Sequence, residues 1–394
     1  MARVAVFVFG YPPARCGGGP IVSVSRLCRA EEQHELRVFT RDREHTPGSK
    51  SFGLPRRVFM TDGSTKIAYL RTGPRDLAWM IGSLRRWKPE IYYVNSLHGR
   101  FFALLPLLLE RFGIVPRSVT LLNPRGETSP GSQSIKPWKK RLGRPLVRAL
   151  VGRRTVWHAA AQHEDVDIRR WLGRRGSVAR VLVQGNFAAL PASVSSGGSG
   201  ASDLQVAFAS RVHPTKGLMP ALEALGESRV RMDLSVYGPI EDSGYWSECL
   251  AVAARYEEWM RLSYKGEYDS DDSADIFGNA DLAVLLSRGE SFGHAIAEAL
   301  ATGCPVLVSA NTPWTDFVNQ GCGLASNDPV VLSGFVQAYS RSSYAAKSAN
   351  RKEIHQRYSD WYEANRPNAS LFSEALRANS SILDSRCYGG LERA

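Results

Sequence analysis

The chain has 394 residues, of which 43% are hydrophobic and 22% are charged. This composition excludes a largely disordered chain, and the length predicts two or three domains at ~150 residues each. The formal net charge of +12 favours a polyanionic partner, which leaves open nucleic acid, an anionic membrane and phosphorylated substrates.

The six cysteines are scattered and none forms a CxxC pair, so no zinc site is expected and a disulfide framework has no support. A reducing cytoplasm is the compartment that fits best. The apolar start of the chain runs into Gly10 and two prolines, which predicts a first strand and not a signal peptide. The longest other apolar run, 101–109, is too short to span a bilayer.

Short apolar runs alternate with helical stretches in the first half of the chain. The pattern predicts strands at 4–9, 36–40, 91–94, 118–122, 156–160 and 179–183. Helices are predicted near 20–33, 75–86, 100–111, 137–153 and 163–172. Apolar strands separated by helices indicate βαβ units and a parallel sheet, so residues 1–190 are expected to form one α/β domain.

The segment 136–154 is strongly basic, with eight lysines or arginines and no acidic residue. Trp138, Leu142, Leu146 and Leu150 recur at four-residue spacing, so one helix face is apolar and the others are basic. Such a helix can lie on an anionic bilayer. The alternative is that the apolar stripe packs on the first sheet while the arginines are solvated.

A Ser- and Gly-rich segment, 191–203, interrupts the alternation and predicts a linker. Strands are then expected at 204–209, 231–236, 281–286 and 305–308, and helices at 216–225, 245–259, 292–301 and 330–339. Residues 204–345 would form a second α/β domain, and 346–394 a helical tail that packs back toward the first domain. The expected architecture is two doubly wound domains facing a central cleft, with ligands at the carboxyl ends of strands.

Two glutamates mark the segment 281–305 as the most informative part of the chain. Glu290 lies in the turn after a buried-type strand, before a helix that begins near Phe292 or Gly293 and presents free backbone amides to an anionic or hydroxyl-rich ligand. Glu298 lies in an apolar helical stretch, where a carboxylate is unfavourable unless it is paired or holds a ligand. A solvated helix face is the alternative, and the pattern leaves the two equal.

Two cations follow the expected strand 204–209. Arg211 and Lys216 flank a helix start, where they can clamp a diphosphate and neutralise the charge that develops as it leaves. The alternative is an exposed basic loop. In the first half, Gly18 and Gly19 precede a helix and allow the backbone to approach a ligand closely, or else form a flexible turn.

Motifs in family order resemble the retaining glycosyltransferases of family four, the glycosyl transferases group 1, which have the GT-B fold. In the first half they are RCGGGP (15–20), NSLHG (95–99), NPRG (123–126) and WHA with HE (157–164). In the second half they are ASRVHPTKG (209–217), YGPIED (237–242) and the segment from ESFG to EALATGCPV (290–306). This last segment contains two glutamates separated by seven residues. One motif alone is weak, whereas several in the right order are strong. The resemblance covers nearly the whole chain.

This resemblance implies a retaining, metal-independent glycosyltransferase of the hexosyltransferase class. The donor would be a UDP-sugar or GDP-sugar, with no cofactor, and the acceptor a lipid-linked compound or an oligosaccharide. Residues 1–190 would bind the acceptor and 204–345 the nucleotide sugar. The expected role is in cell-surface polysaccharide or glycolipid synthesis, in the cytoplasm or peripherally on the inner face of the plasma membrane.

The resemblance also implies roles for individual residues. The donor sugar would be contacted by a run of four residues: Glu290, Ser291, Phe292 and Gly293. Glu298 would hold the ribose, while Arg211 and Lys216 hold the diphosphate. Gly18 and Gly19 would lie beside the leaving diphosphate and the acceptor, and His98 would position the donor near its reacting carbon. Arg125 is a further candidate for binding the acceptor or a phosphate.

Asp269 belongs to an acidic stretch, 269–275, in front of a short expected helix. Acidic residues are ordinary at a helix start, so an Asp-x-Asp metal site is not expected here. A weaker interpretation places the Asp269 carboxylate against a guanine edge, from which it accepts two hydrogen bonds.

Two alternatives to glycosyl transfer remain. A sugar-nucleotide 2-epimerase on the same fold needs other carboxylate placements, which the sequence does not show. A nucleic-acid-binding protein fits the charge of +12, but the chain has no recognition motif and no basic stripe interleaved with aromatic residues.

Overall fold

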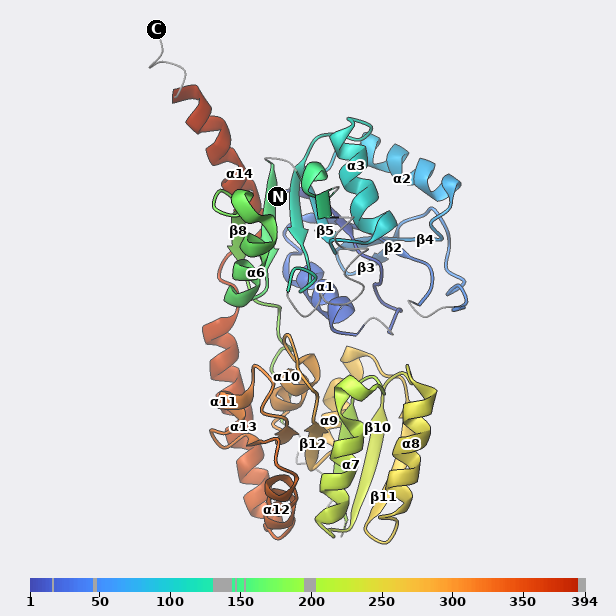
Figure 1. Cartoon of the computed structure of the whole chain (residues 1–394), viewed down its shortest axis with the longest axis vertical. Coiled ribbons are helices and arrows are strands. Elements are labelled where there is room, and N and C mark those ends of the chain that lie inside the picture. Colours follow the sequence, from blue (N-terminus) through green and yellow to red (C-terminus); the bar gives the residue numbers. More distant parts are fainter. Residues whose placement is uncertain are drawn as a thin grey trace. The chain divides into compact units, whose positions relative to one another are not determined.

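Figure 1 shows a computed structural model of the chain, which describes residues 1–15, 18–44, 48–129, 144–145, 147–151, 154–194 and 203–388, with 381–388 as backbone. The chain divides into two compact units. Unit 1 is Met1–Phe187 with Pro367–Ala394, and unit 2 is Ala188–Arg366. Most of the expected linker, 195–202, lies outside the described residues.

The sheet of unit 1 has the order β3-β4-β2-β1-β5-β6-β7-β8 among the described residues. Its strands are β1 (Arg3–Phe7), β2 (Glu35–Arg41), β3 (Met60–Asp62), β4 (Thr65–Leu70), β5 (Ile91–Asn95), β6 (Val119–Asn123), β7 (Thr155–Ala159) and β8 (Arg180–Val183). All neighbours run parallel except the β3–β4 hairpin, which the predicted strands do not include. The other strands confirm the predicted parallel sheet.

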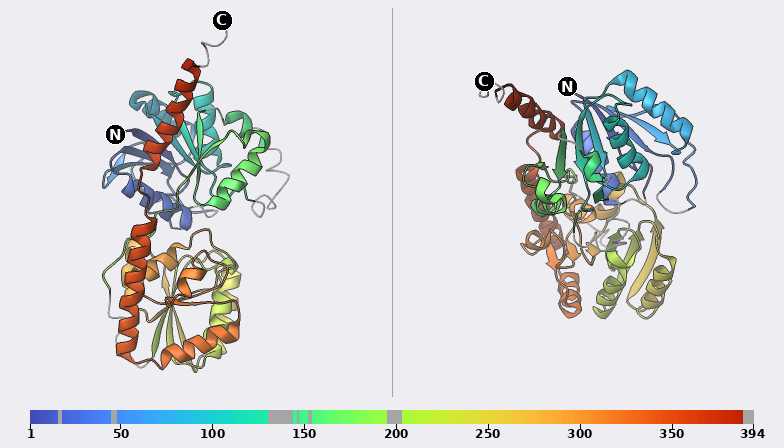
Figure 2. Two further views of the ribbon diagram at one scale, coloured as in Figure 1. Left: turned by 90° about the vertical axis from the view of Figure 1, so that its left-hand side faces the viewer. Right: turned by 45° about the horizontal axis from the view of Figure 1, so that its top comes forward.

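Helices cover both faces of this sheet. Val4 and Val6 of β1 pack in one cluster with α1 (Gly19–Ala30) and α14 (Leu371–Tyr388), which lies across β6, β7 and β8 (Figure 2). Ala5 and Phe7 point to the other face, with α2 (Pro74–Trp87), α3 (Leu105–Arg111) and α6 (Gln162–Leu172). Such a doubly wound sheet leaves the carboxyl ends of its strands for ligands.

Unit 2 has an entirely parallel sheet of order β11-β10-β9-β12-β13-β14 among the described residues. Its strands are β9 (Leu204–Ala209), β10 (Met232–Tyr237), β11 (Met260–Gly266), β12 (Leu282–Leu285), β13 (Val306–Val308) and β14 (Gly323–Ala325). Its helices are α7 (Leu218–Glu227), α8 (Ser243–Ala254), α9 (Ser273–Gly278), α10 (His294–Ala301), α11 (Thr315–Val318), α12 (Pro329–Ser340) and α13 (Tyr344–Asn365). The edge strands β11 and β14 are absent from the predicted strands.

The tail that the sequence presents as one segment, 346–394, is divided between the units. In unit 2, buried Arg351 of α13 donates hydrogen bonds to the carbonyl oxygens of Phe277 and Ala280, at 3.0 and 2.6 Å. In unit 1, the carboxylate of Glu31 accepts hydrogen bonds from the Leu371 amide and the Ser370 hydroxyl, at 2.7 and 2.6 Å. Each half of the tail therefore has its own buried polar anchor.

Only the end of the basic segment 136–154 is described. Val147 and Leu150 are buried in the core of unit 1, so the apolar stripe packs inward at Leu150. Arg144 and Arg148 lie over the ring of Trp171, each with its guanidinium carbon 5.4 Å from the ring centroid. Trp138, Leu142, Leu146 and the basic residues 136–141 lie outside the described residues. No helix among the described residues has the length and apolar character that a membrane span requires.

Candidate active site

In unit 2, the candidate residues gather where parallel strands end. Arg211 and Lys216 follow β9, and Glu290 follows β12, which is hydrogen-bonded to β9 in the sheet. Because the carboxyl ends of parallel strands meet at one edge, loops from β9 and β12 share the same ligand position. His98, Gly18 and Gly19 belong to unit 1 and are described separately below.

Lys216 and Glu290 form an ion pair, with the lysine Nζ 2.6 Å from Oε1 of the glutamate. The side chains are 17% and 10% exposed, so the pair is largely shielded but still open to a ligand. Lys216 ends a short 3₁₀ turn, Pro214–Lys216, whose first free amide, that of Thr215, donates to His213 Nδ1 at 3.2 Å. The sequence points to both residues separately, and the structure joins them as one pair.

Gly217 explains why these two loops meet. Its φ is +73°, and a Cβ there would collide with the carbonyl oxygen of Leu286 at the end of β12. The amide of Arg288 also donates a hydrogen bond to the carbonyl oxygen of Thr215, at 2.9 Å. Glycine is therefore needed so that the loop after β9 can lie against the loop after β12.

Arg211 has a carboxylate partner that the sequence analysis does not single out. Its Nη1 donates to both carboxylate oxygens of Glu241, at 2.8 and 2.7 Å. The amides of Glu241 and Asp242 both donate to the carbonyl oxygen of Val212, at 3.2 and 3.3 Å. The loop after β10 is thus fixed to the loop after β9, and Glu241 sets the direction of the guanidinium.

The loop of Glu290 is held by an aromatic cluster before α10 begins at His294, close to the predicted start. The Phe292 carbonyl accepts a hydrogen bond from Trp314 Nε1 at 2.5 Å, and the two rings lie 5.7 Å apart. Gly293 has a φ of +81° and precedes the helix. Ser291 lies between Glu290 and this anchored pair, so the four residues 290–293 form one fixed turn.

Glu298 is 2% exposed, which rules out the solvated helix face that the sequence left open. Its Oε1 accepts a hydrogen bond from the Ser270 hydroxyl at 2.6 Å. A carboxylate buried in this way is stable only with such hydrogen bonds or with a bound ligand. Ser270 belongs to the loop after β11, so α10 and this loop meet at the carboxyl edge of the sheet.

Asp269 caps the short turn that precedes α9. Its carboxylate accepts a hydrogen bond from the Asp272 backbone, and its own amide donates to Asp272 Oδ2 at 2.9 Å. This confirms the prediction of helix-start chemistry for Asp269. Within the part of the chain that the structure describes, no three His, Cys, Asp or Glu side chains gather as ligands for a metal ion.

In unit 1, the loop that carries His98 is organised by Glu127, a residue that the sequence analysis does not identify. The carboxylate accepts hydrogen bonds from the Ser96 hydroxyl and from the amides of Leu97 and His98, at 2.9, 3.0 and 3.1 Å. These bonds fix the backbone of His98 at the carboxyl end of β5. No local sequence pattern connects Glu127 with a loop about thirty residues earlier, because the two meet only through the pairing of β5 and β6.

A buried polar network joins the carboxyl ends of the strands next to that loop. His158 of β7 accepts a hydrogen bond at Nδ1 from Asn123, at 2.9 Å, and its Nε2 donates to the carbonyl oxygen of Gln184, also at 2.9 Å. Burial lowers the pKa of His158 to about 4, so the ring is neutral near pH 7. Arg125, with a φ of +50°, donates to the side-chain oxygens of Asn95 and Asn186 and so spans the network.

Gly18 and Gly19 lie at the start of α1. Gly18 is the N-cap, with a φ of +57°, and its carbonyl oxygen accepts the first hydrogen bond of the helix from the Ile21 amide. The backbone here has the conformation that favours glycine, which fits a close approach to a ligand. Cys16 and Gly17 of the same motif lie outside the described residues.

Residues 195–329 match the family described as Glycosyl transferases group 1. This match lies within unit 2, Ala188–Arg366, and includes no residue of unit 1. The matched region contains Arg211, Lys216, Glu290 and Glu298, the candidate residues of unit 2. No curated protein matches the chain in sequence.

The whole chain is similar in fold to solved glycosyltransferase structures. Sucrose-phosphate synthase from Thermosynechococcus elongatus has a TM-score of 0.65 and 15% identity over 99% of this chain and 100% of its own. HepE from Anabaena, solved with UDP-glucose, has a TM-score of 0.62 and 14% identity over 98% and 100%. WaaG, a glycosyltransferase of lipopolysaccharide biosynthesis, has a TM-score of 0.57 and 13% identity over 96% and 99%. These likenesses confirm the predicted GT-B type of fold with two α/β units.

Proposed function

We propose that this protein transfers a sugar from a nucleoside diphosphate to an acceptor hydroxyl with retention of configuration, as in family four. The observation that carries the proposal is the Lys216–Glu290 ion pair at the carboxyl edge of the group 1 domain. It places a cation for phosphate beside a carboxylate that accepts hydrogen bonds from sugar hydroxyls. Buried Glu298, in the α10 helix that follows the turn of Glu290, adds a second hydrogen-bond acceptor.

In this proposal, each residue acts on a different part of the donor. Arg211 and Lys216 neutralise the diphosphate as the bond between the anomeric carbon and the phosphate oxygen breaks. Glu290 and the turn 291–293 hold the sugar, and Glu298 holds the ribose. The acceptor oxygen forms the new bond on the same face, and its proton passes to the leaving phosphate oxygen. This route needs no separate basic side chain.

The donor that we propose is a UDP-sugar. HepE, one of the similar structures, was solved with UDP-glucose. The Asp269 carboxylate is engaged in a capping box, which disfavours its use against the guanine of a GDP-sugar. The proposed acceptor is a lipid-linked compound or an oligosaccharide, bound by unit 1 beside the turn at Gly18 and Gly19, while His98 positions the donor near its reacting carbon.

The proposed setting is the synthesis of cell-surface polysaccharide or glycolipid, peripherally on the cytoplasmic face of the plasma membrane. WaaG, a glycosyltransferase of lipopolysaccharide biosynthesis, shares the fold. The net charge of +12 supports attraction to anionic lipid. Co-sedimentation with anionic and neutral vesicles tests this: binding should be confined to anionic vesicles and fall as salt rises.

The activity is tested by incubating the protein with UDP-glucose and following the release of UDP together with the transfer of glucose to water or to candidate acceptors. Glycosyl transfer predicts UDP and a glycoside whose anomeric configuration, read by NMR, equals that of the donor. Turnover in excess EDTA should match turnover with added magnesium or manganese. An epimerised sugar nucleotide without UDP release would instead support the 2-epimerase, and tight binding of a short duplex DNA would support the nucleic-acid-binding alternative.

A further inference from the structure

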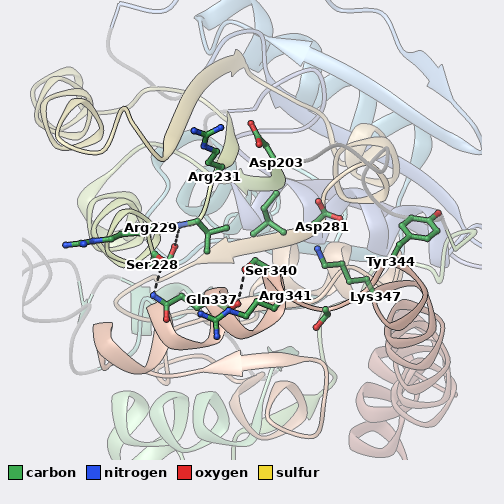
Figure 3. A pocket seen from close by; sticks show the side chains of 13 residues that line it. Asp203, Ser228, Arg229, Arg231, Asp281, Gln337, Ser340, Arg341, Tyr344 and Lys347 are labelled. Atoms are coloured by element: carbon green, nitrogen blue, oxygen red, sulfur yellow. Dashed lines mark hydrogen bonds between the residues drawn. The ribbon is translucent and has the colours of Figure 1, made fainter.

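A cavity of about 690 Å³ lies in unit 2 at the amino ends of its strands (Figure 3). Its lining includes Leu204 at the start of β9, Arg231 just before β10 and Asp281 just before β12. The candidate active site follows the carboxyl ends of β9 and β12. Because β9 has 6 residues, each rising about 3.3 Å, the two sites are about 20 Å apart.

The cavity wall is rich in cations. Four basic side chains line it: Arg229, Arg231, Arg341 and Lys347. None of the four forms an ion pair with another described residue within 4.0 Å. Asp203 and Asp281 are the acidic lining residues, which leaves an excess of two positive charges. One Asp281 oxygen already accepts the Gln205 amide, at 2.9 Å.

The turn that carries Arg229 is rigid. Arg229 has a φ of +52°, a left-handed conformation that is unfavourable for a residue with a side chain. Its amide donates to the Gly226 carbonyl at 3.1 Å, and the side chain of Gln337 donates to the neighbouring Ser228 carbonyl at 3.0 Å. The second bond ties the turn to α12, as Figure 3 shows. The cavity is therefore shaped before any ligand binds.

The first turn of α13 forms one side of the cavity. Tyr344 and Lys347 line it, and the amino end of this 22-residue helix adds positive potential on the same side. Lys347 Nζ also lies 5.1 Å above the ring of Tyr339, which steadies its position. Planar guanidinium groups match phosphate oxygens in geometry, and 690 Å³ suits an organic ligand more than a lone ion.

From these observations we infer that this cavity is a second anion site, which binds the phosphate group of a phosphorylated ligand apart from the donor. The same chemistry suits a soluble phosphorylated metabolite and an anionic lipid headgroup. A site about 20 Å from the chemistry does not take part in the reaction, so its effect on the enzyme is regulatory or localising.

The test uses the full chain with Arg211→Ala and Lys216→Ala, so that the candidate active site no longer supplies phosphate-binding cations. Inorganic pyrophosphate is titrated into this chain by calorimetry at low salt. Adding Arg229→Ser and Arg341→Ser should weaken binding at least about tenfold. The matched pair Arg255→Ser and Lys352→Ser removes the same charge from exposed positions outside the cavity and should change binding less than about twofold.

Vesicles distinguish the two sources of phosphate. If the Arg229→Ser/Arg341→Ser variant, but not the matched pair, also loses binding to phosphatidylglycerol vesicles, the ligand is a lipid headgroup. If the same variant loses pyrophosphate binding but keeps vesicle binding, the ligand is a soluble phosphorylated compound. Absence of pyrophosphate binding, or an equal loss in both pairs, overturns the inference. If the chain with Arg211→Ala and Lys216→Ala unfolds, the Arg229→Ser/Arg341→Ser variant and the matched pair are instead compared with Arg211 and Lys216 intact, in the presence of saturating UDP. Failure here leaves the proposed sugar transfer untouched.

Discussion

At the scale of single residues, the candidate site is built from cations that short loops hold against carboxylates. The sequence points to Arg211, Lys216, Glu290 and Glu298 as candidates, through their local pattern and the family motifs that they belong to. It does not identify Glu241 or Glu127, whose partners are 30 residues or so away in the chain and meet them only in the folded sheet. Both carboxylates orient residues that the sequence does single out.

Replacing Lys216 with alanine should remove a contact to the diphosphate that strengthens as it leaves. We expect kcat/KM to fall on the order of 10²-fold, because one such contact is typically worth that much. Glu290→Gln alone should also lower activity. The double variant should lose less than the product of the two single losses, since the side chains form one ion pair at 2.6 Å. Initial rates measure all three variants. A loss in the double variant equal to the product of the two single losses would contradict a shared role.

Glu241→Gln tests whether this carboxylate positions Arg211. The amide keeps the shape but loses the charge that holds the guanidinium at 2.7–2.8 Å. Because the proposed role of Arg211 is to act on the leaving group, we expect kcat to fall about tenfold with a smaller change in KM. Glu248→Gln, an exposed change in α8, the helix that follows the loop of Glu241, is the control and should leave both constants unchanged. Equal effects of the two changes would contradict a positioning role.

At the scale of elements, the site depends on close contacts between loops and on polar groups at strand ends. Buried strands such as β1, β5 and β12 are predictable as apolar runs. The edge strands β11 and β14 are not, because β11 has only one buried residue and β14 has three residues including Gly323. Within the β3–β4 hairpin the same reason applies to β3, which has three residues and none buried, but not to β4, which has five buried residues among six and is absent from the predicted strands.

Gly217→Ala should separate the two loops of the site. The new Cβ would meet the Leu286 carbonyl in a backbone conformation that already disfavours alanine, so we expect a loss of about 1–3 kcal/mol in stability and a large loss of activity. Gly334→Ala, in α12 where nothing lies within 4 Å, is the matched control and should stabilise by up to about 1 kcal/mol. Denaturant unfolding measures both. Equal stability of the two variants would contradict the packing argument.

His158 makes the stability of unit 1 depend on pH. Its pKa is about 4 in the folded protein, against 6.5 ordinarily, so folding favours the neutral ring. The stabilisation is fully present above pH 6.5 and is lost as the pH falls toward 4, by up to about 3 kcal/mol. Unfolding free energies at pH 7 and pH 5 should differ less in His158→Gln than in the wild type. A His158 ring that titrates near 6.5 by NMR would refute this.

At the scale of the whole molecule, the sequence predicts the α/β architecture but not how its tail is used. Alternating strands and helices define both parallel sheets, whereas α13 and α14 resemble one polar helical tail in sequence. Their assignment to different units depends on partners far away, namely the carbonyls before β12 for Arg351 and Glu31 for the start of α14. Such long-range anchors leave no local pattern.

The central claim is that the carboxyl edge of the unit 2 sheet binds a nucleoside diphosphate sugar. Calorimetric titration of UDP into the wild type, Lys216→Ala and the Arg229→Ser/Arg341→Ser variant tests it most directly. The account predicts that the tightest UDP site of the wild type has an affinity at least about tenfold lower in Lys216→Ala and unchanged in the cavity variant. UDP binding that survives loss of Lys216 but disappears with Arg229 and Arg341 would contradict it.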